Sequence, residues 1–217
     1  MRDMSSQPFA VPLPPHRQYR DFLAPEELSA LLDYSLANRD RFKPSLLAGK
    51  VLDPERRRSV QLGALGPFRA LFDEKLRAMA DDLFASVGTK PFEIDYIELE
   101  MVAHNDGAHF RAHSDIPVGP GRERLGGDSS GRHDRLLSGV YYYHREPKGF
   151  GGGELRLHRF GGQGAPGDHV DIAPEQNSLL IFPSWAIHEV RPIRCASGLF
   201  EDSRFAINAW LCRADSN

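Results

Sequence analysis

A histidine and a carboxylate stand two positions apart in His113-Ser-Asp115, and a second histidine follows much later in the chain, at His188. Residues two apart in an extended segment point to the same face, so this imidazole and this carboxylate can hold one metal ion together. Two imidazoles and one carboxylate on one side of Fe(II) leave positions open for further ligands. These residues alone leave open the alternative that His113 and His188 are ordinary polar residues at strand ends.

The chain holds a second pair of this kind, His169-Val-Asp171. A jelly roll brings together strands that are distant in the sequence. Several short strands fit between Asp115 and His188, whereas only a single strand fits between Asp171 and His188. We therefore predict that His113 and Asp115 belong to the metal site and that His169 and Asp171 lie on the surface of an ordinary strand.

An arginine begins the apolar segment 204–211, in which alternate residues should share a face. Burying a guanidinium is costly unless a carboxylate pairs with it, ideally through two parallel hydrogen bonds. A dicarboxylic cosubstrate would supply that partner, and a solvated arginine on a surface strand is the alternative. The face of Arg204 is completed by Ala206, Asn208 and Trp210.

Short alternating or apolar segments separated by Gly, Pro, Asn and Asp predict a sandwich of two sheets or a jelly roll. The chain has 20 glycines and 16 prolines, which favours many turns over a helical bundle. The expected strands are 97–101, 107–113, 136–144, 154–160, 169–173, 178–183, 188–193 and 205–211.

Two amphipathic helices are predicted before the strands, over residues 25–38 and 67–86. The first has Pro25 at its start and Glu26 and Glu27 in its first turn, where they complement the helix dipole. Residues 1–18 are predicted to be an irregular Pro-rich arm, and 39–58 a basic irregular segment. Residues 19–217 would form one domain, with helical support in 19–89 and a jelly-roll core in 90–213.

The composition narrows the class of protein. The net charge is −3, which does not favour a nucleic-acid partner, and no apolar run predicts a membrane span. Cys195 and Cys212 form no paired metal-binding motif. We expect a cytoplasmic protein, and a secreted protein with one disulfide is the alternative.

Six segments occur in the order seen in prolyl 4-hydroxylase-like 2-oxoglutarate/Fe(II) oxygenases, and the chain resembles the hypoxia-type and bacterial members over about residues 90–213. This resemblance implies a mainly β fold, a double-stranded β-helix packed against two or more helices. It also implies iron bound by His113, Asp115 and His188. The segments are Phe110–Asp115, Gly139–Tyr143, Gly152–Leu157, Leu179–Pro183, His188–Pro192 and Arg204–Trp210.

The resemblance also implies a site for 2-oxoglutarate. Arg204 would pair with its distal carboxylate, and Tyr142 matches the tyrosine whose hydroxyl contacts the same group. Val140 shares the face of Tyr142, whereas Tyr141 and Tyr143 are expected only to pack. The apolar wall positions are matched by Leu155, Val190 and Trp210.

The chain departs from the family pattern in three places. Residues 195–203 lengthen the connection from His188 to Arg204, so that Arg191 or Arg194 stays an alternative anchor. His104 replaces an expected tyrosine, either as a contact of 2-oxoglutarate or substrate or as a solvated turn residue. The long polar insertion 116–134 is either a substrate lid or a loop without that role.

The implied reaction is hydroxylation of a C–H bond with release of succinate and CO2, using Fe(II), 2-oxoglutarate and O2, with ascorbate as a further expected cofactor. Related halogenases lack the carboxylate that Asp115 supplies, so its presence favours hydroxylation.

The expected substrate is a prolyl residue in a protein or peptide. Alternatives are a free amino acid or other small metabolite, a cupin-like metal protein that does not use 2-oxoglutarate, and a jelly-roll module without metal. A nucleic-acid demethylase is disfavoured because Trp210 stands where a second arginine is usual. Whether the chain forms a homodimer is left open by the sequence.

Overall fold

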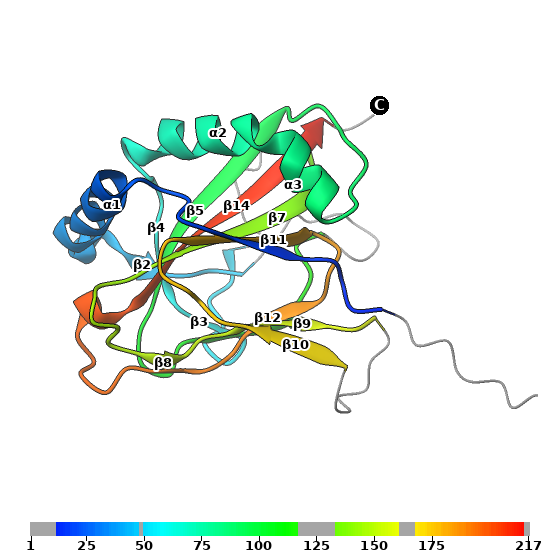
Figure 1. The fold of residues 1–217 in the computed structure, drawn as a ribbon. Helices are drawn as coiled ribbons and strands as arrows, with labels where there is room; N and C mark the ends of the chain where they lie inside the picture. Colours follow the sequence, from blue (N-terminus) through cyan, green and yellow to red (C-terminus); the bar gives the residue numbers. More distant parts are fainter. Residues whose placement is uncertain (1–11, 48–49, 117–132, 161–167, 215–217) are drawn as a thin grey trace, which may run out of the picture.

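Two antiparallel sheets form the body of the molecule, one above the other in Figure 1. The computed structural model describes residues 12–47, 50–116, 133–160 and 168–214. The large sheet has seven strands in the order β1-β11-β7-β14-β5-β4-β2, and the small sheet has five in the order β10-β9-β12-β6-β3. A short pair, β13 and β8, lies beside them. Several neighbours in these sheets, such as β1 and β11 or β6 and β12, are distant in sequence, as in a jelly roll.

The strand bounds agree with most of the predicted segments. The strands are β1 (Arg17–Arg20), β2 (Lys43–Pro44), β3 (Arg57–Arg58), β4 (Val60–Leu62), β5 (Tyr96–His104), β6 (His109–His113), β7 (His133–Tyr143), β8 (Gly151–Gly152), β9 (Leu155–His158), β10 (His169–Ile172), β11 (Ser178–Pro183), β12 (His188–Val190), β13 (Ile193–Arg194) and β14 (Arg204–Ala214).

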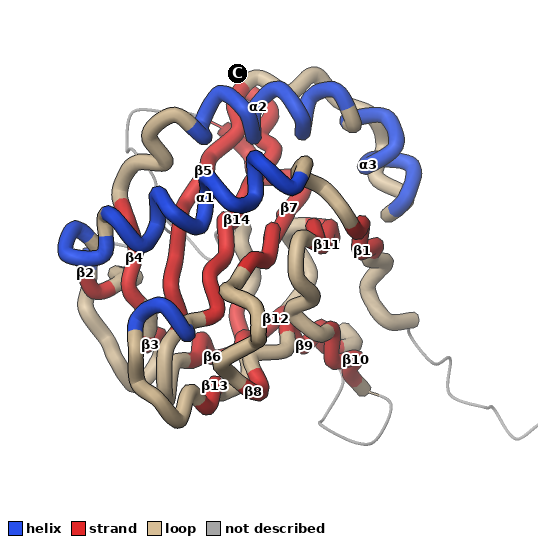
Figure 2. The backbone as a smooth tube through the Cα atoms, turned by 60° about the vertical axis from the view of Figure 1, so that its left-hand side comes forward, coloured by secondary structure: helices blue, strands red, loops and turns tan. Residues whose placement is uncertain are grey.

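The helices cover the outer face of the large sheet (Figure 2). They are α1 (Pro25–Ala37), α2 (Phe68–Ala78) and α3 (Ala80–Ser86), with short 3-10 turns η1 (Arg39–Arg41) and η3 (Phe200–Asp202). Pro25 occupies the first turn of α1, and the Glu27 carboxylate accepts a hydrogen bond from the Ala24 amide at 2.9 Å. The helix expected over 67–86 is divided at Met79, whose backbone (φ −95°, ψ 0°) leaves the helical range.

Alternation along β7 separates two hydrophobic cores. Tyr141 and Tyr143 pack with the helices, whereas Val140 and Tyr142 point between the two sheets. The predicted division of these tyrosines by face is therefore confirmed, since side chains alternate along a strand. The inner core of the jelly roll is formed by Val102, Val140, Tyr142, Leu155, Leu157, Ile172, Leu180, Phe182, Ala186 and Ala206.

Some local expectations differ from the structure. The segment 39–58, predicted to be irregular, contains η1, β2 and part of the small sheet through β3. The strand expected over 188–193 divides into β12 and β13. Residues 117–132 of the polar insertion and 1–11 of the Pro-rich stretch lie outside the described residues, while 17–20 pair with β11. Within the described part of the chain, the helices are too short or too polar to cross a bilayer.

Candidate metal centre and cosubstrate site

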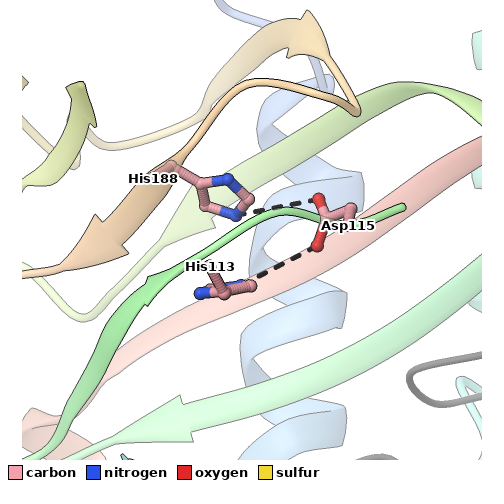
Figure 3. A group of neighbouring side chains, drawn as sticks. All are labelled: His113, Asp115 and His188. Atoms are coloured by element: carbon pink, nitrogen blue, oxygen red, sulfur yellow. Dashed lines mark ion pairs between the residues drawn. The ribbon is translucent and has the colours of Figure 1, made fainter. Parts of the chain in front are cut away.

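Two strands of the small sheet bring the predicted metal ligands together. His113 ends β6, His188 begins β12, and the two are direct cross-strand partners. Asp115 lies just beyond β6, where its amide donates to the Ser184 carbonyl at 3.0 Å. One ligand atom from each of His113, Asp115 and His188 lies within 4.8 Å of the others, and the three side chains converge in Figure 3. This spacing allows a single ion to contact all three.

Backbone carbonyls fix the tautomer of both imidazoles. His113 Nδ1 lies 2.8 Å from the Arg111 carbonyl oxygen, and His188 Nδ1 lies 2.9 Å from that of Ala186. A carbonyl only accepts, so each Nδ1 carries a proton, and Nε2 is the ring atom of each histidine that can contact a metal ion. The Nε2 atoms of His113 and His188 face the Asp115 carboxylate at 3.8 and 3.7 Å. Metal-binding histidines usually donate their other ring N–H to a carbonyl or carboxylate, as the two Nδ1 atoms do here.

The charge state of the cluster suits a divalent cation. Burial, together with the neighbouring His188, lowers the pKa of His113 to about 3, so its imidazole is neutral at pH 7. Burial opposes ionisation of Asp115, but the His188 and His113 imidazoles and the Arg135 guanidinium hold the pKa of this carboxyl below its ordinary value. Two imidazole nitrogens and one carboxylate oxygen are ligands typical of non-haem Fe(II).

A hydroxyl pair anchors the carboxylate from the large sheet. Ser138 Oγ donates to Asp115 Oδ2 at 2.6 Å and lies 2.9 Å from Ser184 Oγ. Ser138 is absent from the residues that the sequence predicts for this site. It shares the inner face of β7 with Val140 and Tyr142, so the parity of that strand is the signal that could have found it.

Acidification should destabilise the metal-free protein, because His113 and His104 are buried in the neutral form and their pKa values lie below the ordinary value. Below pH 6.5 the unfolded chain binds protons that the folded chain does not, so stability is lost as pH falls. The expected loss is about 1.4 kcal/mol per imidazole per pH unit. Urea unfolding at about pH 7.5 and about pH 5.5 measures it. His113→Gln should show a smaller pH dependence, and an unchanged one would contradict this assignment.

Arg204 lies at the start of β14 and is only 1% exposed, so the alternative of a solvated arginine is wrong. Its guanidinium carbon lies 4.7 Å from the centroid of the Tyr142 ring, and its Nη1 lies 3.2 Å from His104 Nδ1. Its Nε and Nη2 and the Tyr142 hydroxyl are buried without a hydrogen-bond partner among the described residues. Burial lowers the pKa of this guanidinium.

These unpartnered groups fit an external carboxylate. A buried guanidinium without a bonded anion is costly, and an anion that accepts from Nε and Nη2 would remove that cost. Gly153 keeps the backbone close to this arginine, because a Cβ there would lie 2.9 Å from Arg204 Cδ. The alternative anchors are not buried: Arg194 is exposed, and Arg191 pairs with Glu189 at 3.1 Å.

His104 is 4% exposed and is the direct cross-strand partner of Arg204. The alternative of a solvated turn residue is therefore wrong. Burial and the nearby Arg204 lower the pKa of His104 well below its ordinary value, which keeps the imidazole neutral.

The remaining predicted contacts lie in three places. Val140 and Leu155 lie in the inner core, and Val190 packs against the small cluster around Ile193. Trp210 lies six positions after Arg204 on β14, opposite Ser138. The guanidinium carbon of Arg135 is 3.9 Å from the Trp210 ring centroid.

The second H-x-D pair behaves as predicted. It lies on β10, at an edge of the small sheet, where Asp171 Oδ1 accepts from Arg156 Nε at 2.7 Å. Neither His169 nor Asp171 belongs to the group of potential metal ligands found among the described residues.

The fold and the site together define a jelly-roll metalloprotein with a two-histidine, one-carboxylate centre. The model of the 2OG-Fe(II) oxygenase superfamily matches residues 99–212, more than half of the chain. The protein therefore belongs to the 2OG-Fe(II) oxygenase superfamily, and the matched region contains all three clustered residues and Arg204.

One curated relative and two solved structures are informative. An uncharacterized PKHD-type hydroxylase of Synechocystis is 29% identical over 198 residues, which are 89% of this chain but 62% of the relative. A Pseudomonas putida prolyl-4-hydroxylase has a TM-score of 0.58 at 20% identity, covering 94% of both chains. A Trichoplax adhaerens prolyl hydroxylase, solved with a hypoxia inducible factor peptide fragment, has a TM-score of 0.61 at 20% identity, covering 90% of this chain and 82% of its own. The structural likenesses show the shared fold.

Proposed function

We propose that this protein is an Fe(II)- and 2-oxoglutarate-dependent dioxygenase that hydroxylates a C–H bond of a prolyl residue in a protein or peptide. The observation that carries the proposal is the buried Arg204, whose Nε and Nη2 have no partner among the described residues. A metal site alone would also suit a cupin-like protein that does not use 2-oxoglutarate. A buried cation that lacks its anion favours a dicarboxylate as the second ligand.

Separate groups of residues would hold the metal ion and the cosubstrate. His113, Asp115 and His188 would hold Fe(II), with both Nε2 lone pairs and the carboxylate directed at it. Arg204 and the Tyr142 hydroxyl would hold the distal carboxylate of 2-oxoglutarate. The neutral His104 would orient the guanidinium through Nη1 and leave Nε and Nη2 for the cosubstrate.

When bound, Fe(II), 2-oxoglutarate and O2 supply an oxidative decarboxylation that yields succinate and CO2 and delivers one oxygen atom to the substrate C–H bond. The chain itself contributes position and environment. Val140 and Leu155 lie in the inner core, where they would keep water from the cosubstrate. Ser138 donates a hydrogen bond to the Asp115 carboxylate and would keep its orientation fixed for a metal ion.

The prolyl substrate is supported by likeness alone. The Synechocystis relative carries the name of a hydroxylase, and the two structural relatives are prolyl hydroxylases, one of them with a bound peptide. A free amino acid or other small metabolite is the alternative that the same reaction would serve.

Succinate release tests the reaction, and mass spectrometry tests the substrate. Purified protein with Fe(II), 2-oxoglutarate and air should convert proline-containing peptides to products heavier by one oxygen atom, with one succinate formed for each product. A panel of free amino acids is the second arm. Product in the peptide arm supports the proposal, product only in the amino-acid arm replaces the substrate, and no 2-oxoglutarate consumption in either arm overturns the reaction.

A further inference from the structure

Phe110 connects the metal ligand His113 to an arginine on the next strand. Its ring stacks on the His113 imidazole, with centroids 3.6 Å apart and planes inclined by 21°. On β3, Arg57 is the direct cross-strand partner of Phe110, and its guanidinium carbon lies 5.1 Å from the ring centroid. The phenyl ring is therefore in contact with both the imidazole and the guanidinium.

The large sheet holds Arg57 in place. Arg57 Nη2 donates to Glu100 Oε2 at 2.9 Å, and the same oxygen accepts from Asn208 Nδ2 at 3.0 Å. Arg57 Nε also donates to Ser59 Oγ at 3.2 Å. The ion pair is well covered, since the side chains of Arg57 and Glu100 are 10% and 19% exposed. Because β3 belongs to the small sheet and Glu100 to the large one, this pair links the two sheets beside the metal ligand.

We propose that Arg57 is a positioning residue for the metal centre, acting through Phe110 on the plane of the His113 imidazole. The hydrogen bond from Nδ1 to the Arg111 carbonyl fixes one point of the ring but leaves rotation about that point. Stacking on Phe110 removes this freedom, and Arg57, held by Glu100, keeps Phe110 in its place. A metal site of correct geometry before the ion arrives binds more tightly than one that must be ordered by it. The inference rests on the proposed function only in taking His113 as a metal ligand.

Co(II) affinity, measured by titration calorimetry on the full chain, tests the proposal without turnover. Arg57→Met should weaken Co(II) binding about 10-fold or more, because changes in the outer shell of a metal site cost 10–100-fold. Arg58→Met is the matched control: it removes the same charge from the same strand, but the side chain is exposed and should change the affinity less than about twofold.

A second pair of variants separates positioning from general stabilisation. Phe110→Leu removes the stack and should weaken Co(II) binding as Arg57→Met does, whereas Phe110→Tyr keeps the ring and should bind as the parent protein does. The Co(II) absorption bands should change shape in the first variant and not in the second. Thermal unfolding of the metal-free proteins identifies any variant that does not fold. If Arg57→Met does not fold, Phe110→Leu tests the positioning of the His113 ring in its place.

The outcomes distinguish failure of the proposed metal centre from failure of the proposed positioning role of Arg57. If the parent protein does not bind Co(II), or if His113→Ala binds it as tightly as the parent does, the metal centre itself is wrong. If those two proteins behave as expected but the folded Arg57→Met and Phe110→Leu variants keep the parent affinity, the link between the sheets is only structural and the positioning role is wrong.

Discussion

Replacing Arg204 with methionine is expected to weaken 2-oxoglutarate binding by roughly 30-fold or more, because removing one partner of a buried, hydrogen-bonded charge pair costs about 2 kcal/mol or more. The guanidinium supplies two buried N–H donors, at Nε and Nη2, that no described residue uses. Methionine keeps most of the apolar stem and loses both donors. The measurement is the Kd for 2-oxoglutarate in the presence of Co(II) or Ni(II), supported by the KM in the succinate assay.

The same substitution should raise the stability of the protein in the absence of ligands. Arg204 is 1% exposed, and burial lowers its pKa, so the folded chain carries the cost of an unpaired cation. Apolar residues in place of buried charges often stabilise proteins. Urea unfolding without 2-oxoglutarate should therefore show a higher free energy of unfolding for Arg204→Met. Opposite signs for stability and binding would exclude general damage as the cause.

Arg194→Met is the matched control for this prediction. Arg194 is exposed, lies on β13 close in sequence to His188, and is one of the alternative anchors for 2-oxoglutarate. Its replacement should leave the Kd within about twofold. Loss of binding in Arg194→Met with normal binding in Arg204→Met would contradict the assignment of the anchor.

Asp115→Ala is expected to abolish succinate formation and to weaken metal binding by more than about 100-fold, beyond the usual effect of outer-shell changes. The variant removes the one carboxylate of the cluster and leaves only two imidazoles to hold a divalent cation. It also leaves the Ser138 hydroxyl without the carboxylate that it contacts at 2.6 Å. Metal titration and the succinate assay measure the two losses separately.

The second H-x-D pair supplies the control for Asp115→Ala. Asp171→Ala removes a carboxylate with the same sequence spacing from a histidine, but this carboxylate forms a partly exposed ion pair with Arg156. Surface pairs contribute little, so metal affinity and turnover should stay at the parent level. Turnover that persists in Asp115→Ala without added iron would contradict the proposed metal centre.

The alternating segments of the sequence predicted the parts of the site that lie on long strands. In β7 a change of one position reverses the face, so the shared parity of Val140 and Tyr142 agrees with the family match of Tyr142, and Tyr141, which is expected only to pack, lies toward the helices. Spacing also chose between the two H-x-D pairs, because several strands fit between Asp115 and His188 but only one between Asp171 and His188, and the structure pairs His188 with His113.

The contacts around Arg57 could not be predicted in this way. The β3 strand contains only Arg57 and Arg58, too few residues for a periodic pattern, and a basic segment is ordinarily a solvated one. The strand exists because its backbone pairs with β6, and its charge is tolerated because Glu100, distant in sequence, comes from the opposite sheet. Such tertiary partners leave no local signal.

The position of β14 has a consequence for how the molecule is made. This strand follows all the other described strands in the chain, yet it lies between β5 and β7 near the middle of the large sheet. During synthesis β5 and β7 emerge well before their shared neighbour and present unpaired edges, which are prone to wrong association. The strand that closes these edges is also the one that carries Arg204. Completion of the sheet and arrival of the proposed cosubstrate anchor would therefore be one event in the synthesis of the protein.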